Sequence, residues 1–277
     1  MAKPFLKWAG GKRQLSEALC HFKPATFSNY FEPFLGGGAF FFQLLPETAY
    51  LSDINHDLIT TYTVVKNNVS ELIQELSSFS YSEETYYKIR NQDRLSSYSQ
   101  FTDLQKAARF IYLNKTCYNG LYRVNLDNQI NTPFGHYKNP LICDQKNLIA
   151  VSKKLQHVQL DIQPFQSTLK HVQKNDFIYL DPPYDPVSKT SNFTGYAKDK
   201  FGKDEQIALK NYCDAIDKKN AFFMVSNSST DFIKDIYKDY TINTIKANRS
   251  INSNAKKRGP VDEVLITNYP TKSYTPK

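Results

Sequence analysis

A short acidic segment near the middle of the chain has residue types suited to chemistry on an aromatic amine. The segment is Asp181-Pro182-Pro183-Tyr184, and it directly follows the apolar run 177–180. Because proline can neither donate to a β-ladder nor continue a helix, the chain must leave the sheet here. We therefore predict a stiff loop at a sheet edge that presents a carboxylate, a backbone carbonyl and an aromatic ring.

Such a loop suits the exocyclic amine of a nucleobase, which is a poor nucleophile because its lone pair is delocalised into the ring. The carboxylate of Asp181 and the carbonyl of Pro182 can accept both N–H bonds and favour a pyramidal amine. The ring of Tyr184 can hold the plane of the base, so that catalysis needs positioning and electrostatics but no strong base. The alternative interpretation is a proline-rich turn in which Tyr184 belongs to the core.

Two glycine-rich segments precede this loop. The first, Trp8-Ala9-Gly10-Gly11-Lys12-Arg13, lacks both the earlier glycine and the Ser or Thr after lysine that a phosphate-binding P-loop needs. It can instead hold a carboxylate and an adenine-like ring, or form a turn that packs Trp8. The second, Gly36-Gly37-Gly38, stands between a predicted strand at 30–34 and a helix at 39–45, which is the start of a nucleotide-binding crevice. Phe41 replaces the third glycine of the dinucleotide fingerprint.

An acid at the end of the next apolar run extends this crevice. Asp53 follows the run 50–52, where a carboxylate can accept from ribose hydroxyls. Its alternative role is the N-cap of the helix that starts near Asp57.

The remaining pattern places these segments in an α/β protein. Apolar residues recur at three- and four-residue steps from Leu58 to Phe79, which predicts a helix that Asn67 and Asn68 can break into two. A capping box at 102–105 predicts another helix, and we interpret 57–159 as a mainly helical insertion. Strands are expected at 158–162, 177–180, 221–226 and 263–267, with a helix at 204–218.

Composition supports an ordered protein with a basic surface. The 277 residues are 40% apolar and 14% aromatic, and the net charge of +8 suits a polyanionic partner. Four cysteines and five histidines are scattered without metal-ligand spacing, so we predict neither a metal site nor disulfides. The chain has no run of 18 apolar residues, and we expect a soluble, cytoplasmic protein.

Four segments occur in one order along the chain: Trp8 to Lys12, Glu32-Pro33-Phe34-Leu35 with the three glycines, Ser52-Asp53-Ile54-Asn55, and Asp181 to Tyr184. This ordered set resembles the Dam family of DNA adenine-N6 methyltransferases, in the α arrangement with the target-recognition domain between the two key motifs. The resemblance covers nearly the whole chain. It implies a Rossmann-like methyltransferase sheet built from 1–56 and 160–277, interrupted by a recognition domain at 57–159.

The resemblance also implies S-adenosylmethionine as methyl donor, without a metal. The family's donor contacts carry over to Trp8, Lys12, Phe34, Gly36, Gly38, Asp53, Asp161 and Asp181. Asp181, Pro182, Pro183 and Tyr184 would form the catalytic loop, with the tyrosine stacked on an adenine that is flipped out of the duplex.

A recognition hairpin and its partner follow from the same resemblance. Tyr118, Asn119, Leu121, Arg123 and Pro133 match the hairpin of GATC-specific members, where the arginine reads guanine and the tyrosine wedges into the base stack. Tyr122 and His136 differ from some relatives, which leaves the contacts beside them open. Segment 190–196 resembles the loop that closes over the flipped base. The implied partner of this monomer is double-stranded DNA, without a membrane, and a cognate restriction endonuclease in the same system would need no direct contact.

Other functions share part of this pattern. A cytosine-N4 methyltransferase needs the same amine chemistry, and RNA or protein-glutamine methyltransferases are more distant alternatives. The order of the motifs and the aspartate at 181 favour adenine, since the glutamine enzymes more commonly carry asparagine there. A DNA-binding protein without catalysis would be expected to lack some of the catalytic positions, all of which are present here.

Overall fold

The computed structural model describes residues 1–8, 15–187, 201–248 and 260–274. Lys12, segment 190–196 and the basic residues Arg249, Lys256, Lys257 and Arg258 lie outside the described residues.

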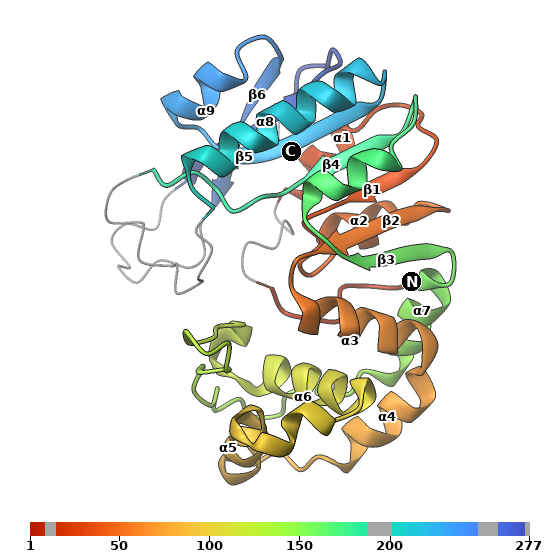
Figure 1. Ribbon diagram of the computed structural model, residues 1–277, viewed down its shortest axis with the longest axis vertical. Helices are drawn as coiled ribbons and strands as arrows, with labels where there is room; N and C mark the ends of the chain where they lie inside the picture. Colours follow the sequence, from red (N-terminus) through yellow and green to blue (C-terminus); the bar gives the residue numbers. More distant parts are fainter. Residues whose placement is uncertain (9–14, 188–200, 249–259, 275–277) are drawn as a thin grey trace.

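A seven-stranded mixed sheet forms the centre of the described chain (Figure 1). Its strands are β1 (Tyr30–Glu32), β2 (Ala49–Asp53), β3 (Val158–Ile162), β4 (Phe177–Leu180), β5 (Phe222–Ser228), β6 (Thr241–Asn248) and β7 (Pro260–Thr267). The order is β3-β2-β1-β4-β5-β7-β6, with β1 to β5 parallel and β7 antiparallel to both of its neighbours. The predicted α/β class is therefore confirmed, and the order reverses between β1 and β4 as in doubly wound sheets. β1 ends two residues earlier than predicted, directly before Pro33.

The central strands β1, β4 and β5 are buried on both faces, and their successive residues alternate between two cores. In β4, Phe177 and Tyr179 pack with α1 (Ser16–Phe22) and α2 (Ala39–Leu44), whereas Ile178 and Leu180 pack with α8 (Lys203–Lys218). α9 (Asp231–Ile236) and the 3-10 helix η4 (Phe165–Lys170) complete the second layer. Continuous apolar strands between two helical layers are expected for parallel sheets.

The segment between β2 and β3 is mainly helical, as predicted. It contains α3 (His56–Asn67), α4 (Val69–Ser78), α5 (Glu83–Arg90), η1 (Asn91–Arg94), η2 (Ser96–Gln100), α6 (Asp103–Thr116), η3 (Tyr118–Gly120) and α7 (Gln145–Leu155). The predicted break falls at Asn68, and the capping box at Thr102 is present.

Figure 1 shows α4, α5 and α6 at the end of the molecule away from the sheet. In contrast, α3 contacts β2 and β3, and α7 contacts β3, so both helices also cover the sheet. β3 begins at Val158, two residues before the predicted start of the second catalytic segment at 160. The division of the chain into separate domains stays a prediction.

Candidate active site

Three carboxylates follow or end neighbouring parallel strands at one edge of the sheet. Glu32 ends β1, Asp53 ends β2 and Asp181 directly follows β4. Because β1 lies between β2 and β4, the carboxyl ends of these strands meet where the strand order reverses. This edge is where doubly wound sheets bind their ligands.

Asp53 is held by backbone N–H groups on both of its oxygens. Oδ2 accepts from the N–H of Gly36 at 3.0 Å, and Oδ1 accepts from the N–H of Asn55 at 3.0 Å. Burial raises the pKa of Asp53, although these backbone donors oppose the shift. The alternative role as a helix N-cap is wrong, because Asn55 caps α3 by accepting from the N–H of Leu58 at 3.0 Å.

The glycine turn after β1 is required by close contacts as well as by backbone conformation. Gly38 has φ +64°, and a Cβ there would lie 2.9 Å from the hydroxyl of Tyr62. A Cβ on Gly36 would lie 2.7 Å from the indole of Trp8. Trp8 in turn stacks on Tyr122, with ring centroids 5.6 Å apart. The glycine turn therefore holds Trp8 in place, and Trp8 contacts Tyr122 in the segment between α6 and α7.

Apolar side chains line the same edge of the sheet. Phe34 stacks on Phe165, with ring centroids 5.3 Å apart. Ile54, directly after β2, is 71% exposed, and Ile162, at the end of the edge strand β3, is 47% exposed. Asp161 precedes Ile162 at the sheet edge and accepts from the amide of Gln159 at 2.7 Å. The sequence could not indicate these two isoleucines, because exposure cannot be read from an apolar residue type.

The loop 181–184, which the sequence predicts to be catalytic, is fixed by polar side chains from β5 and α8. The hydroxyl of Ser226 donates to Oδ1 of Asp181 at 2.9 Å, and the amide of Gln206 donates to the carbonyl of Pro183 at 2.9 Å. The carbonyl of Pro182 takes no hydrogen bond from any residue that the structure describes. The Asp181 carboxylate and the Pro182 carbonyl are the two acceptors that the sequence predicted, and their role in catalysis stays a prediction.

The ring of Tyr184 is held at its far end by a buried acid on β7. Its hydroxyl donates to Oε2 of Glu263 at 3.0 Å, and Glu263 is only 8% exposed. Burial and the nearby negative charges of Asp181 and Glu263 raise the pKa of Tyr184, so the phenol keeps its proton. Tyr184 itself is half-buried.

Glu32 is the most perturbed carboxyl of the site. It is 2% exposed, and Tyr30 donates a hydrogen bond to its Oε2 at 2.7 Å. Burial raises the pKa of Glu32 to about 8, and the charges of Asp181 and Asp53 add to the shift. Glu32 is thus protonated at neutral pH, which removes one negative charge from a crowded edge.

The predicted recognition residues share one exposed segment between α6 and α7. The segment is held in shape by two isolated bridges, Cys117 to Phe134 and Val124 to Ile130. Within it, Tyr118 is 53% exposed and Arg123 is exposed, with Nε donating to Oδ1 of Asn131 at 2.7 Å. The other members are Asn119 and Pro133, which are exposed, and Leu121, which is half-buried.

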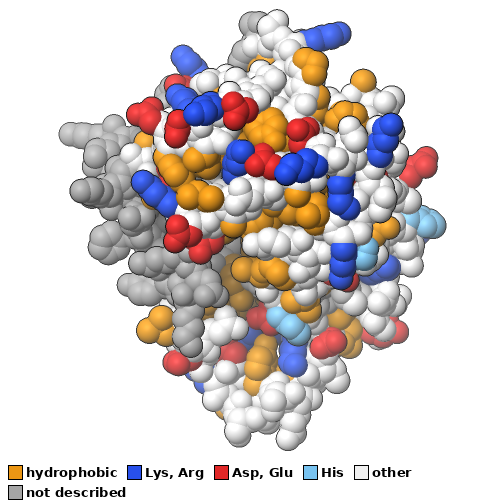
Figure 2. Space-filling view, turned by 45° about the horizontal axis from the view of Figure 1, so that its top comes forward, with side chains coloured by type: hydrophobic (Ala, Val, Ile, Leu, Met, Phe, Trp, Pro, Cys, Tyr) orange, Lys and Arg blue, Asp and Glu red, His pale blue; other side chains and the backbone are white. Residues whose placement is uncertain are grey.

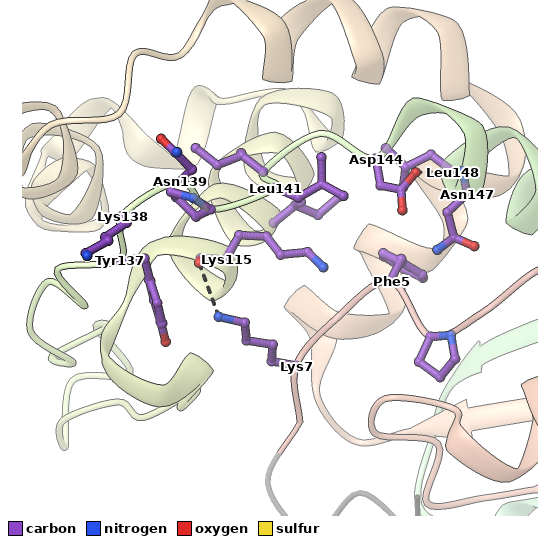
Figure 3. A pocket seen from close by; sticks show the side chains of 14 residues that line it. Phe5, Lys7, Lys115, Tyr137, Lys138, Asn139, Leu141, Asp144, Asn147 and Leu148 are labelled. Carbon is purple, nitrogen blue, oxygen red and sulfur yellow. Dashed lines mark hydrogen bonds between the residues drawn. The ribbon is translucent and has the colours of Figure 1, made fainter.

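A basic pocket of about 410 Å³ lies beside this segment (Figure 3). Lys7, Lys115, Lys138 and Tyr137 contribute to its lining, and Figure 3 shows the ammonium group of Lys7 directed toward the Lys115 carbonyl and that of Lys115 pointing away from it. Nζ of Lys7 lies 3.9 Å from the centroid of the Tyr137 ring, and burial together with the charge of Lys7 lowers the pKa of Lys115. Three lysines and one aspartate, Asp144, line this pocket, so its charge is positive overall.

Elsewhere charges are mixed. Figure 2 shows basic and acidic side chains interspersed over one face of the molecule. Among the described residues, no cluster of three or more His, Cys, Asp or Glu side chains is arranged to hold a metal ion. No helix in the described part of the chain is long and apolar enough to cross a membrane.

Comparison with known proteins places these features in a family. Residues 8–251 match the profile of D12 class N6 adenine-specific DNA methyltransferases. The chain is 43% identical over 287 aligned residues to the type II methyltransferase M.MjaIII of Methanocaldococcus jannaschii, covering 96% of this chain and 99% of that one. It is 39% identical to the type II methyltransferase M1.LlaDCHI of Lactococcus lactis, covering 96% and 95%. It is 32% identical to the DNA adenine methylase of Escherichia coli K12, covering 95% and 94%.

Proposed function

Because the chain belongs to the D12 class of N6 adenine-specific DNA methyltransferases, we propose that it methylates N6 of adenine within GATC in duplex DNA, with S-adenosylmethionine as donor. The observation that carries the proposal is the fixed pair of acceptors at the end of β4. Ser226 donates to Asp181 and Gln206 donates to the Pro183 carbonyl, whereas the Pro182 carbonyl accepts no hydrogen bond from the residues that the structure describes.

The neighbouring strand ends suit the donor. Asp53 is immobilised by two backbone N–H groups, which leaves further lone pairs to accept from ribose hydroxyls. Ile54 and Ile162 offer exposed apolar surface for an adenine ring, with Phe34 nearby on β1's turn and Asp161 at the rim. When bound, S-adenosylmethionine supplies an electrophilic methyl group on a sulfonium.

The chain's own residues then position the target amine. Asp181 and the Pro182 carbonyl accept the two N6–H bonds, which makes the nitrogen pyramidal and frees its lone pair. Tyr184, anchored by Glu263, stacks on the flipped adenine and fixes its plane. The N6 lone pair forms the new N–C bond while the S–C bond breaks, and one N6 proton is released. The products are N6-methyladenine and S-adenosylhomocysteine.

DNA recognition is proposed for the exposed segment and the basic pocket. Arg123 can read a guanine edge, and Tyr118 can wedge into the base stack beside it. Lys7, Lys115 and Lys138 form a cationic surface next to the segment, where phosphate groups of the duplex would lie.

The test is methyl transfer from labelled S-adenosylmethionine to three short duplexes. One contains GATC, one contains the same site already methylated at N6 on both strands, and one contains a scrambled tetranucleotide. We expect label in the first alone, and N6-methyladenine as the labelled nucleoside after digestion. Equal label in the first and third would refute the GATC assignment, and N4-methylcytosine would refute the choice of base.

Asp181→Ala tests the site itself. This variant should lose methylation while keeping duplex binding, and Asp239→Ala, at an exposed aspartate away from the strand ends, is the matched control. Undiminished turnover by Asp181→Ala would remove this acid from the mechanism.

A further inference from the structure

A buried charge network connects η1 and α6 to residues 130–132, in the exposed segment between α6 and α7. Asp93, in η1, has a side chain that is only 7% exposed. Its carboxylate pairs with Arg109 of α6 at 2.7 Å and with the neighbouring Arg94. The same carboxylate accepts from the backbone N–H of Ile130 at 2.8 Å.

Both backbone groups of Ile130 are thereby bound by side chains. While Asp93 accepts from its N–H, Nη2 of Arg94 donates to its carbonyl at 2.9 Å. Thr132, two residues later, is held in the same way, because Tyr86 donates to its carbonyl at 2.7 Å. A backbone segment fixed at two nearby points leaves little freedom for the residue between them.

That residue is Asn131, and it holds Arg123. Oδ1 of Asn131 accepts from Nε of Arg123 at 2.7 Å, and the Asn131 carbonyl accepts from Nη2 at 3.2 Å. The backbone N–H of Asn131 donates to the Arg123 carbonyl at 3.0 Å. These contacts use two of the five N–H donors of the guanidinium and fix the direction of the rest.

We propose that Asp93 is a positioning residue for sequence recognition: it acts through Ile130 and Asn131 to set the direction of the Arg123 guanidinium. The inference rests on the proposed function of Arg123 as a guanine reader. Bidentate readout requires a guanidinium fixed in orientation, because both N–H bonds must reach the base edge together. The charge of Asp93 is needed too, since it neutralises Arg109, which is 2% exposed.

The experiment measures kcat/KM on a GATC duplex and on duplexes with one base pair changed at each position. Asp93→Asn should reduce discrimination at the guanine read by Arg123 by about fivefold or more, with smaller changes at the other positions. The position is identified independently as the one at which Arg123→Ala loses discrimination. In the Arg123→Ala background, Asp93→Asn should have no further effect on discrimination at that position.

Two further variants separate positioning from loss of stability. Leu76→Ala removes a buried side chain of α4 that takes no part in the network, and it should lower the melting temperature without changing discrimination. Arg94→Met removes the donor to the Ile130 carbonyl but leaves Asp93 paired with Arg109, and it should reproduce the specificity change if Asp93→Asn fails to fold. Asp103→Asn, at an exposed aspartate, is the matched control for the substitution.

The outcomes are distinct. The positioning role would be overturned if discrimination stayed unchanged in both Asp93→Asn and Arg94→Met. It would also be overturned if discrimination fell equally at all base positions and fell as much in Leu76→Ala. If the unaltered enzyme shows no preference for GATC, or Arg123→Ala changes no position, the proposed function of the segment fails before the positioning role is reached.

Discussion

Replacing Glu32 with glutamine should make the stability of the protein less dependent on pH. Glu32 is 2% exposed, and burial raises its pKa from 4.5 to about 8. Above pH 4.5 the unfolded chain has lost this proton, whereas the folded protein keeps it until about pH 8. The folded state therefore binds more protons in this window, and stability must fall as pH rises.

The size of the effect follows from the pKa difference. One pKa unit corresponds to about 1.4 kcal/mol, so two pH units inside the window correspond to about 2.7 kcal/mol in the free energy of unfolding. Glutamine has nearly the same volume, can accept the hydrogen bond from Tyr30, and carries no titratable group. Between pH 5.5 and pH 7.5, the free energy of unfolding of the original protein should thus fall by about 2.7 kcal/mol relative to that of Glu32→Gln.

Urea unfolding of both proteins at pH 5.5, 6.5 and 7.5, without donor or DNA, measures this difference. Glu84→Gln, at an exposed glutamate of α5, is the control and should follow the original protein at every pH. A stability difference between the original protein and Glu32→Gln that stays constant across the three pH values would show that Glu32 is ionised in the folded state. That result would refute the argument from burial.

Three other changes test separate parts of the site. Gly38→Ala places a Cβ 2.9 Å from the Tyr62 hydroxyl at a residue with φ +64°. It should lower the free energy of unfolding by about 1–3 kcal/mol in thermal or urea unfolding. An unchanged unfolding midpoint would contradict this prediction. Tyr184→Phe keeps the stacking ring but loses the hydrogen bond to Glu263. It should lower kcat about tenfold in single-turnover assays while duplex binding stays within twofold. An equal loss of duplex binding would show that the hydroxyl serves DNA affinity instead. Lys115→Gln should reduce the slope of log K against log salt by about 0.9 in DNA-binding titrations, and an unchanged slope would place the pocket outside the DNA interface.

The sequence could predict the position of the acids because each one directly follows or ends a strand. For a parallel sheet, knowing the strands and their order is enough to place their carboxyl ends together. Asp53 and Asp181 therefore lie where the sequence predicted, and the glycine turn lies between them in the expected place. The protonated state of Glu32 could not be predicted, because it depends on burial between two neighbouring strands and on acids distant in sequence.

Elements at the far edge of the sheet were missed for a different reason. β6 pairs only with β7, and α9 has six residues, too few to show a helical apolar period. The sequence also left the N-cap of α3 open, since two polar residues, Asp53 and Asn55, precede the helix. The structure decides between them, because Asn55 accepts from the N–H of Leu58 whereas Asp53 accepts from Gly36, a residue on another loop.

Sheet register explains why the partners of the catalytic loop are absent from any local pattern. Leu180 pairs with Val225, so the next residues, Asp181 and Ser226, stand side by side and their side chains meet. β7 lies beside β5 on the side away from β4, and Glu263 of β7 pairs opposite Ser228 of β5. From this position Glu263 reaches the Tyr184 hydroxyl. A one-residue slip of β5 or β7 would turn Ser226 or Glu263 to the opposite face of the sheet and release the loop. The sequence of the loop 181–184 therefore determines only that the loop is stiff. Its orientation is determined by the pairing of β5 and β7, two strands that follow it in the chain.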